Sequence, residues 1–475
     1  MRWLLACLLA GVVIAVGDGF ARRSSRAELP GAAAATPGGR PEYELRGAGS
    51  CAAAACHNGN GPKGSKGSEY TTWVIHDPHA RAVEVLYGKR SLQIEKKRKH
   101  SPEVDENHPE RDPLCLNCHV RPGIEPYLTQ THKLPRGAAF SYEDGVSCEA
   151  CHGAAGGWLT DHYTAEWRGK SAAQKEAEGM CNTKDLRLRA ELCVRCHVGR
   201  GDIDVNHDLI AAGHPRLAFE FGAFLANMPK HWSEETDKAG RRDFEARAWA
   251  IGQAVSAKAA LKLLAHRADV KNKRPWPEFA EYDCFACHHD LKAQNWRRER
   301  KERKELPGTL PWGSWYFPML PDALGGEAPK ELMDELSSLR EAMQLFGPDQ
   351  QDVMARAQSV SAKLRPWPEK LARQEHDRAA LDKALKRIAA DDRRVSEASW
   401  DGAAQLYLAI AAHDSARDDL DREKRDPVLK TRIQALGKQL SFPPLAPGQH
   451  YDSPAEDGPK RVQEALKRIQ QALQK

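Results

Sequence analysis

Helical periodicity is clearest in the last third of the chain. From residue 328 onward, apolar residues recur at spacings of three and four, which is typical of amphipathic helices with one buried face. Four such stripes are Leu332, Leu336, Leu339, Met343 and Phe346; Leu381, Ala384, Leu385 and Ile388; Trp400, Ala403, Tyr407 and Ala411; and Val462, Ala465, Leu466, Ile469 and Leu473. The pattern predicts an all-α C-terminal region over residues 328–475, with these stripes as its core.

The preceding part of the chain gives a weaker pattern. Strand signals are few and short. Asp77 followed by Pro78 is typical of a helix start, and Gly88 of a helix end. Residues 22–48 are rich in Ala, Gly, Pro and Arg, and the Pro- and Gly-rich stretch within 306–327 marks a boundary, so both segments are interpreted as linkers.

The N-terminus resembles an export signal. A nearly continuous apolar run from Trp3 to Val16 follows Met-Arg and precedes a small-x-small pattern at Gly19-Phe20-Ala21. This predicts a signal peptide over residues 1–21 and a periplasmic location. The run is short for a membrane span, so an uncleaved signal anchor is the alternative and the only membrane attachment expected.

The chemistry concentrates in five motifs in which a cysteine pair is followed at once by histidine. They are Cys51–Cys56–His57, Cys115–Cys118–His119, Cys148–Cys151–His152, Cys193–Cys196–His197 and Cys284–Cys287–His288. This is the attachment signal of c-type haem: two thiols form thioethers with the porphyrin, and the histidine becomes the proximal iron ligand. Zinc ribbons and disulfide scaffolds do not require a histidine after each pair. The sequence therefore predicts five haem c groups.

The first motif departs from the usual spacing because four alanines separate Cys51 from Cys56. The loop must bulge or coil for both sulfurs to reach one ring, and alanine offers no bulk to clash. We interpret it as a haem site. Five motifs within residues 49–305 leave little room for a protein core, so this pentahaem region is predicted to consist of short helices and loops wrapped around haems. The overall fold class is mainly α.

Fourteen histidines remain after the proximal five, out of 19. Bis-histidine iron suits electron transfer, whereas an open position permits ligand chemistry. The sixth ligands favoured by position are His79, His162, His207, His214 and His231. His207 and His214 are seven residues apart, so one helix face could present both. His132 and His289 are weaker candidates, and surface positions are expected for His100, His108, His266, His376, His413 and His450.

The charge balance gives no sign of a nucleic-acid partner. The formal charge is +5, and the propionates of five oxidised haems would cancel it. Two basic runs, within Lys89–Lys99 and Arg297–Lys304, are expected to be solvated faces or docking sites for an acidic redox partner.

Residues 49–200, and more loosely the chain to about 300, resemble the cytochrome c-554 family of periplasmic multihaem cytochromes. The resemblance rests on Trp73, on His79-Ala80-Arg81-Ala82, on Asp144 through Gly153, on His162 and on the fourth motif. It implies haems stacked in pairs, His79 and His162 as distal ligands, and a His119 haem without a protein sixth ligand. The widened first motif, the fifth haem and the C-terminal helices depart from the family.

These observations favour an electron carrier over an enzyme, with periplasmic or membrane-bound redox proteins as partners. One alternative is a multihaem oxidoreductase of the hydroxylamine, nitric oxide or nitrite type, with an open His119 haem. Another is a haem subunit of a larger redox complex, with the C-terminal helices as its interface. No residue is assigned a catalytic role.

Overall fold

The computed structural model describes residues 43–98, 108–122, 141–288, 309–391, 400–441 and 458–474, except residues 202, 327, 422 and 424. Several predictions lie outside these residues: the signal peptide, most of the 22–48 linker, the second basic run, and His100, His132, His289 and His450. Within the described residues, helices dominate and the β-type pairings are two isolated bridges, Arg200–Ile203 and Tyr282–Trp312. The mainly α prediction is confirmed.

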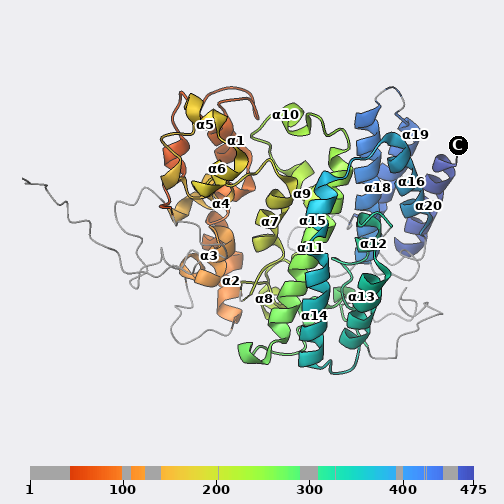
Figure 1. Cartoon of the computed structure of the whole chain (residues 1–475). Coiled ribbons are helices and arrows are strands. Elements are labelled where there is room, and N and C mark those ends of the chain that lie inside the picture. The colour runs from red at the N-terminus through yellow and green to blue at the C-terminus, as the bar shows by residue number, and fades with distance from the viewer. Residues whose placement is uncertain are drawn as a thin grey trace, which may run out of the picture.

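Short helices joined by loops form the first part of the molecule (Figure 1). They are α1 (Glu69–His76), α2 (Lys89–Lys97), α3 (Pro113–His119), α4 (Cys148–His152), α5 (Ala165–Gly169), α6 (Ala172–Ala177), α7 (Leu186–His197), α8 (His207–Ala212), α9 (Phe221–Asn227) and α10 (Glu234–Lys238). Helices α7 and α9 contribute to the main core described below, whereas the apolar contacts of the others are divided among small clusters, such as that of Leu45, Val83, Leu86, Leu116 and Val120. This part of the chain has little continuous core, as expected.

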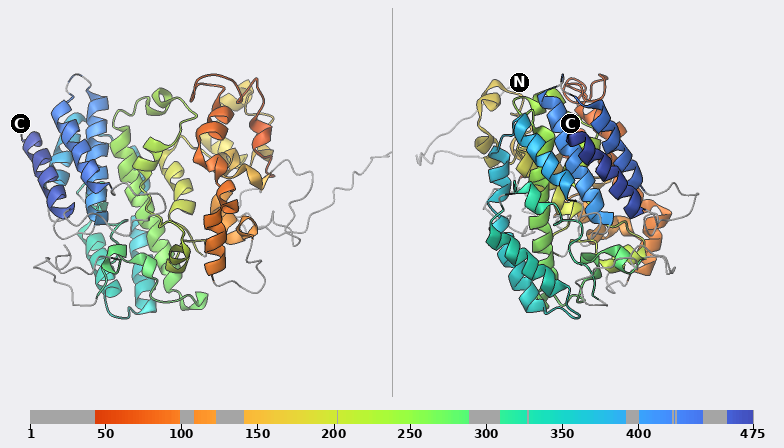
Figure 2. Two further views of the ribbon diagram at one scale, coloured as in Figure 1. Left: turned by 180° about the vertical axis from the view of Figure 1, so that it is seen from behind. Right: turned by 90° about the vertical axis from the view of Figure 1, so that its right-hand side faces the viewer.

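One long helix contradicts the expectation that only short helices occur before residue 305. Helix α11 (Phe244–Ala268) has 25 residues, and most of its side chains are buried. Apolar and small residues occur on all of its sides, which is the pattern of a helix enclosed by neighbours rather than of one lying at a surface. Figure 2 shows α11 between the short N-terminal helices and the C-terminal helices.

The C-terminal helices form the other side of the molecule. They are α12 (Leu320–Ala323), α13 (Lys330–Met343), α14 (Gln350–Leu364), α15 (Trp367–Arg373), α16 (Arg378–Ala390), α18 (Trp400–Leu420), α19 (Pro427–Leu440) and α20 (Gly458–Leu473). The predicted stripe Leu332, Leu336, Leu339 and Met343 is buried, but α13 ends at Met343 and Phe346 is 97% exposed. None of the described helices is long and apolar enough to cross a membrane.

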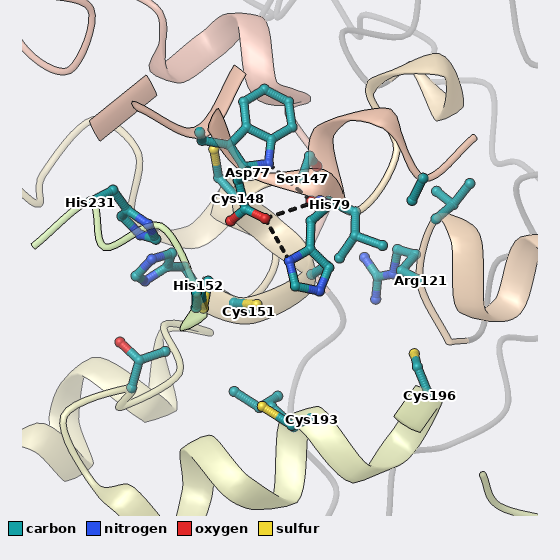
Figure 3. Close-up of a pocket in the computed structure, with 18 of the residues that line it drawn as sticks. Asp77, His79, Arg121, Ser147, Cys148, Cys151, His152, Cys193, Cys196 and His231 are labelled. Atoms are coloured by element: carbon teal, nitrogen blue, oxygen red, sulfur yellow. Dashed lines mark hydrogen bonds and ion pairs between the residues drawn. The ribbon is translucent and has the colours of Figure 1, made fainter. Parts of the chain in front are cut away.

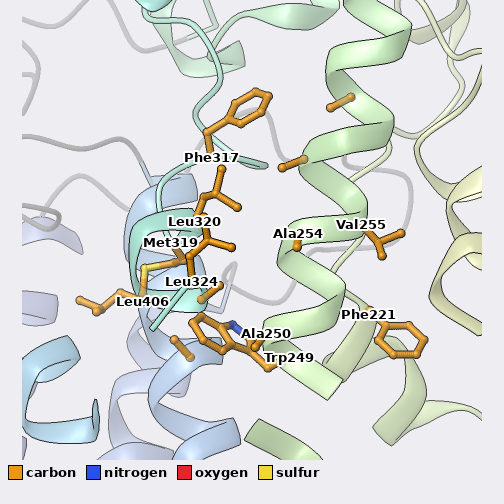
Figure 4. Packing of buried hydrophobic residues seen from close by; sticks show 14 of the residues in the cluster. Phe221, Trp249, Ala250, Ala254, Val255, Phe317, Met319, Leu320, Leu324 and Leu406 are labelled. Atoms are coloured by element: carbon orange, nitrogen blue, oxygen red, sulfur yellow. The ribbon is translucent and has the colours of Figure 1, made fainter. Parts of the chain in front are cut away.

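The main apolar core joins α11 to both of its neighbours. One cluster runs from Leu186 of α7 through α11 to Ile469 of α20. Figure 4 shows Trp249 and Ala254 of α11 with Met319 and Leu320, which lie within the segment predicted as a linker. Residues 309–326 therefore contribute buried side chains to this core. That the chain divides at residues 306–327 into two folding units remains a prediction.

Candidate haem-binding site

A single large cavity lies among α1, α3, α4, α7 and their connecting loops, with a volume of about 1580 Å³. Every cysteine and proximal histidine of the first four motifs lines it, and so do four predicted sixth ligands, His79, His162, His214 and His231. Figure 3 shows part of this cavity, with motif residues and candidate ligands pointing into a common space. The fold thus gathers four motifs around one cavity.

Three of these motifs lie at the C-terminal ends of helices. Helices α3, α4 and α7 each end at the motif histidine. Cysteines three residues apart lie on one face of a helical turn, so both thiols and the following imidazole can address the same group. Asp112 caps α3 by accepting a hydrogen bond from the Leu114 N–H at 2.8 Å, and Asp185 caps α7 in the same way.

The widened first motif closes through a tight turn. Cys51 ends a 3₁₀ turn, Ala48–Cys51. The backbone N–H groups of Cys56 and His57 both donate to the carbonyl oxygen of Ala53, at 2.9 and 3.1 Å. The extra residues are thus coiled, as the sequence led us to expect for a loop that returns both sulfurs to one ring.

Thiol contacts place the motifs next to one another in pairs. A hydrogen bond with the Cys148 thiol lowers the pKa of Cys51, which joins the first motif to the third. A hydrogen bond with Cys196, together with burial, raises the pKa of Cys118, which joins the second motif to the fourth. The Cys196 thiol also lies 3.7 Å from the carbonyl oxygen of Asn117. The cysteines of the five motifs are free thiols in this structure.

Four proximal histidines each face a second histidine at a similar distance. The ring centres are 6.0 Å apart for His57 and His162, 6.1 Å for His197 and His79, 6.2 Å for His152 and His231, and 6.5 Å for His288 and His207. An imidazole nitrogen lies about 2 Å from a metal that it binds, so two imidazoles on opposite sides of one iron have ring centres roughly 6 Å apart. The observed spacing matches this geometry.

Hydrogen bonds on one ring nitrogen orient several of these imidazoles. Two histidines bond carboxylates through Nδ1: His57 bonds Glu69 at 3.1 Å, and His79 bonds Asp77 at 2.8 Å. Three others bond backbone carbonyl oxygens: His119 bonds that of Ala82 at 2.5 Å, His162 that of Leu159 at 2.7 Å, and His214 that of Pro215 at 2.8 Å. Such bonds fix the tautomer and leave Nε2 as the nitrogen for a metal. The buried Nδ1 of His231 has no hydrogen-bond partner among the described residues, which fits a nitrogen whose partner lies outside the polypeptide.

Burial favours the neutral form of three proximal rings. It lowers the pKa of His152 to about 4, with the charge of His231 adding to the effect, and it lowers the pKa of His197 to about 4. Burial also lowers the pKa of His119. In contrast, the hydrogen bond to Asp77 raises the pKa of His79. Neutral imidazole is the form that binds iron, so the environments of His152, His197 and His119 favour ligation over protonation.

A glycine allows the His79 loop to approach the third motif. Gly145 has φ +65°, and a Cβ there would lie 2.6 Å from the His79 carbonyl oxygen. The next residue, Val146, donates its N–H to that same oxygen at 2.9 Å, and Trp73 Nε1 donates to the Val146 carbonyl at 3.2 Å. These contacts bring together the segments on which the family resemblance rests.

His119 differs from the other proximal histidines. In the part of the chain that the structure describes, no second histidine ring lies about 6 Å from it. His214 lines the same cavity, and its pKa is lowered chiefly by burial and to a smaller extent by the charge of His119. His214 is therefore near His119, but no ring stacking joins them.

The fifth motif lies outside the cavity. Cys284 is half-buried, whereas Cys287 and His288 are exposed. The facing residue, His207, begins α8, and its backbone N–H donates to the buried carboxylate of Glu278 at 2.8 Å. The guanidinium of Arg216 lies 3.6 Å from the Cys284 thiol. This site is built from separate loops rather than from a shared cavity.

Three local expectations were wrong. Helix α8 ends at Ala212, followed by Gly213 at φ +127°, so His207 and His214 do not share a helix face. Two 3₁₀ turns, Pro78–Arg81 and Glu84–Tyr87, occupy the segment expected to be one helix, although Asp77 does cap its start. His413 is buried at 6% exposure, because its Nδ1 bonds the Ala409 carbonyl and its ring packs against Trp249.

The sequence did not single out the residues that support the ligands. Asp77 was recognised as a cap, but not as the partner of the His79 ring. Arg216 follows His214-Pro215, and its charge beside a candidate ligand was a usable signal. Glu278 and Glu69 offered no such sequence signal, because single glutamates in polar stretches are common.

The residues present fit haem c in the spacing of the motif cysteines and in the distances between facing histidine rings. Comparison with family models finds a match over residues 50–153 to "Cytochrome c554 and c-prime". Comparison with curated proteins and with solved structures finds no significant match. The match includes the first three motifs and His79, whose contacts with the third motif are described above. Over residues 50–153, the chain is therefore similar to the cytochrome c554 family of c-type cytochromes.

Proposed function

We propose that this c-type cytochrome is an exported electron carrier with five covalently attached haems. The observation that carries the proposal is the set of four facing histidine pairs, three in the shared cavity and one at the fifth motif. Because three of these pairs line one cavity, they support short distances between neighbouring redox centres.

Haem c supplies a reversible one-electron couple at each site. The chain's own residues provide the rest. The cysteine pairs would anchor each haem covalently, and the four facing histidine pairs would supply two iron ligands each, which would exclude exogenous ligands at those four haems. The rings of His79 and His57 donate hydrogen bonds to the carboxylates of Asp77 and Glu69, which hold the imidazoles in place.

Export and partner choice rest on the sequence. The predicted signal peptide over residues 1–21 supports a periplasmic location, where covalent haem attachment takes place in bacteria. Suitable partners are periplasmic or membrane-bound redox proteins. Removal of residues 1–21 should abolish haem attachment in a host that matures c-type cytochromes only after export.

The haem number can be measured directly. The full chain, exported and purified, should show an intact mass with five haems, and a Cys284→Ser/Cys287→Ser variant should show four. The matched control is Cys181→Ser, which alters a cysteine outside the motifs and should keep five. A wild-type mass with four haems would contradict the proposal, and peptide mapping would identify the empty motif.

One observation favours a second function at a single site. Among the described residues, no histidine ring faces His119 at about 6 Å, unlike the other four proximal histidines, which supports an iron able to bind an exogenous ligand. The chain would then combine electron transfer with ligand chemistry at one haem.

Carbon monoxide distinguishes the two possibilities for His119. If no histidine fills the position, the reduced protein should bind CO at one haem, and His214→Ala should leave that binding unchanged. CO binding that is absent from both proteins would point to another histidine, such as His132. If His214 fills the position, CO binding should be absent in the wild type and should appear in His214→Ala. A wild type that binds CO at several haems would contradict the bis-histidine assignment of the other sites.

A further inference from the structure

The fifth motif is supported by residues of the C-terminal half. The Asp283 N–H donates to the Pro311 carbonyl oxygen at 2.9 Å. The Tyr282 hydroxyl donates to the carbonyl oxygen of Met343, at the end of α13, at 2.9 Å. The two features that depart from the cytochrome c554 pattern, the fifth motif and the C-terminal helices, are thus in direct contact.

An ion pair between the half-buried Arg216 and the buried Asp401 forms the centre of this contact. Arg216 donates to Asp401 of α18 at 2.7 Å, lies 3.6 Å from the Cys284 thiol and stacks over Trp315 at 5.6 Å. Ser314 donates to the same Asp401 oxygen at 2.6 Å, and Asp401 is fully buried. Partners on three sides therefore hold the guanidinium beside the motif cysteine.

The charge on Arg216 is stable. The guanidinium of arginine stays protonated in proteins, and the Asp401 carboxylate at 2.7 Å further favours the charged form of Arg216. The guanidinium is therefore a permanent positive charge in a poorly solvated place, where electrostatic effects are larger than in water.

We propose that Arg216, positioned by Asp401 of α18, sets the reduction potential of the haem attached to Cys284 and Cys287. This inference rests on the proposed function, because it requires a haem at the fifth motif. Reduction adds one negative charge to the haem, so a fixed positive charge nearby stabilises the reduced state and raises the potential. The C-terminal helices then act as the platform that holds this charge in place.

The two members of the ion pair predict shifts of opposite sign. Arg216→Gln removes the positive charge and leaves Asp401, so the potential of the fifth haem should fall. Asp401→Asn removes the negative charge and leaves Arg216, so the potential should rise. A purely structural role would loosen the site in both variants and shift both potentials in the same direction.

The experiment is a potentiometric titration of the exported, haem-loaded full chain, followed by optical and EPR spectroscopy. The signal that is missing from Cys284→Ser/Cys287→Ser identifies the fifth haem. We expect Arg216→Gln to weaken its reduction about tenfold, which is about 59 mV for one electron. Arg216→Lys should retain most of the wild-type potential, and the double variant Arg216→Gln/Asp401→Asn should lie between the two single variants.

Arg247→Gln is the matched control. Arg247 is a buried arginine of α11 that donates to Asp243 and to the Ala372 carbonyl, away from the fifth motif. It should leave the fifth potential unchanged. An unchanged potential in Arg216→Gln, or shifts of the same sign in Arg216→Gln and Asp401→Asn, would overturn the proposal. If Arg216→Gln does not accumulate, the other two single variants still test the proposal. Asp401→Asn should raise the potential of the fifth haem, and Arg216→Lys should leave it nearly unchanged.

The two proposals fail in different ways. A wild-type chain whose Cys284 peptide carries no haem refutes the five-haem function, and this inference with it. If the wild-type chain carries five haems and neither Arg216→Gln nor Asp401→Asn changes the potential of the fifth, only the role of Arg216 and Asp401 is refuted.

Discussion

Single residues decide how the candidate ligands are presented. The His79 ring is held on one side by Asp77 at 2.8 Å, and its backbone carbonyl is approached by Gly145 and Val146. Asp77 is 1% exposed, so its carboxylate has lost most of its water and depends on these hydrogen bonds. The position of His79 is therefore fixed before any metal binds.

Loss of one facing histidine should change the spin state of one haem. We expect His79→Ala and His162→Ala each to convert a single low-spin haem to high spin, because each ring lies about 6 Å from a proximal histidine. EPR of the oxidised protein measures this. His76→Ala is the control, since His76 is exposed and precedes Asp77 by one residue. Low-spin spectra in both ligand variants would refute the pairing.

A buried histidine outside the haem motifs should make stability depend on pH. Burial lowers the pKa of His413 to about 4, so the unfolded chain binds a proton between about pH 6.5 and pH 4 while the folded chain does not. Stability is then lost as the pH falls through this window, by up to about 3 kcal/mol. Burial raises the pKa of the neighbouring Asp414 to about 6, and this contributes the opposite slope.

Because these two slopes oppose each other, the variant difference is the informative quantity. The free energy of unfolding of His413→Gln, relative to wild type, should rise by about 3 kcal/mol from pH 7 to pH 4. Denaturant titrations at both pH values measure it. A difference that does not change with pH would show that His413 is protonated in the folded state.

Helices differ in how well the sequence predicted them. The stripe on α13 was predicted because that helix buries one face and exposes the other, which leaves a period in the sequence. Helix α11 was missed because it is enclosed on all sides, so its apolar residues form no stripe. Gly252 illustrates this enclosure, since a Cβ there would lie 2.5 Å from the Phe221 Cβ.

The central position of α11 makes its largest side chain a sensitive site. Trp249 is 1% exposed and contacts the ring of His413. Trp249→Ala should lower the free energy of unfolding by about 3–5 kcal/mol, because it leaves a cavity that the packed helices cannot fill. Phe346→Ala, at a 97% exposed position, should change it by less than about 0.5 kcal/mol. Equal effects in a denaturant titration would contradict the description of this core.

At the scale of the whole molecule, the sequence predicted the motifs but not their partners. Spacing alone identifies the cysteines and proximal histidines, because attachment is local chemistry. The pairing of His57 with His162, or of His288 with His207, joins distant parts of the chain and depends on how the connecting loops fold. The ligand roles themselves remain predictions until spectra test them.

The distribution of apolar contacts predicts how the chain behaves without haem. The cluster from Leu186 to Ile469 is continuous, whereas the clusters in the part before α7 are small and surround the cavity. The full chain, produced without haem attachment, should therefore be cleaved by protease first within residues 43–182, and a fragment starting near residue 186 should persist. The haem-loaded chain is the control and should resist cleavage there. Mass spectrometry of the fragments also tests the domain boundary predicted from the sequence, because folding units divided at 306–327 would leave a fragment starting near residue 328 instead.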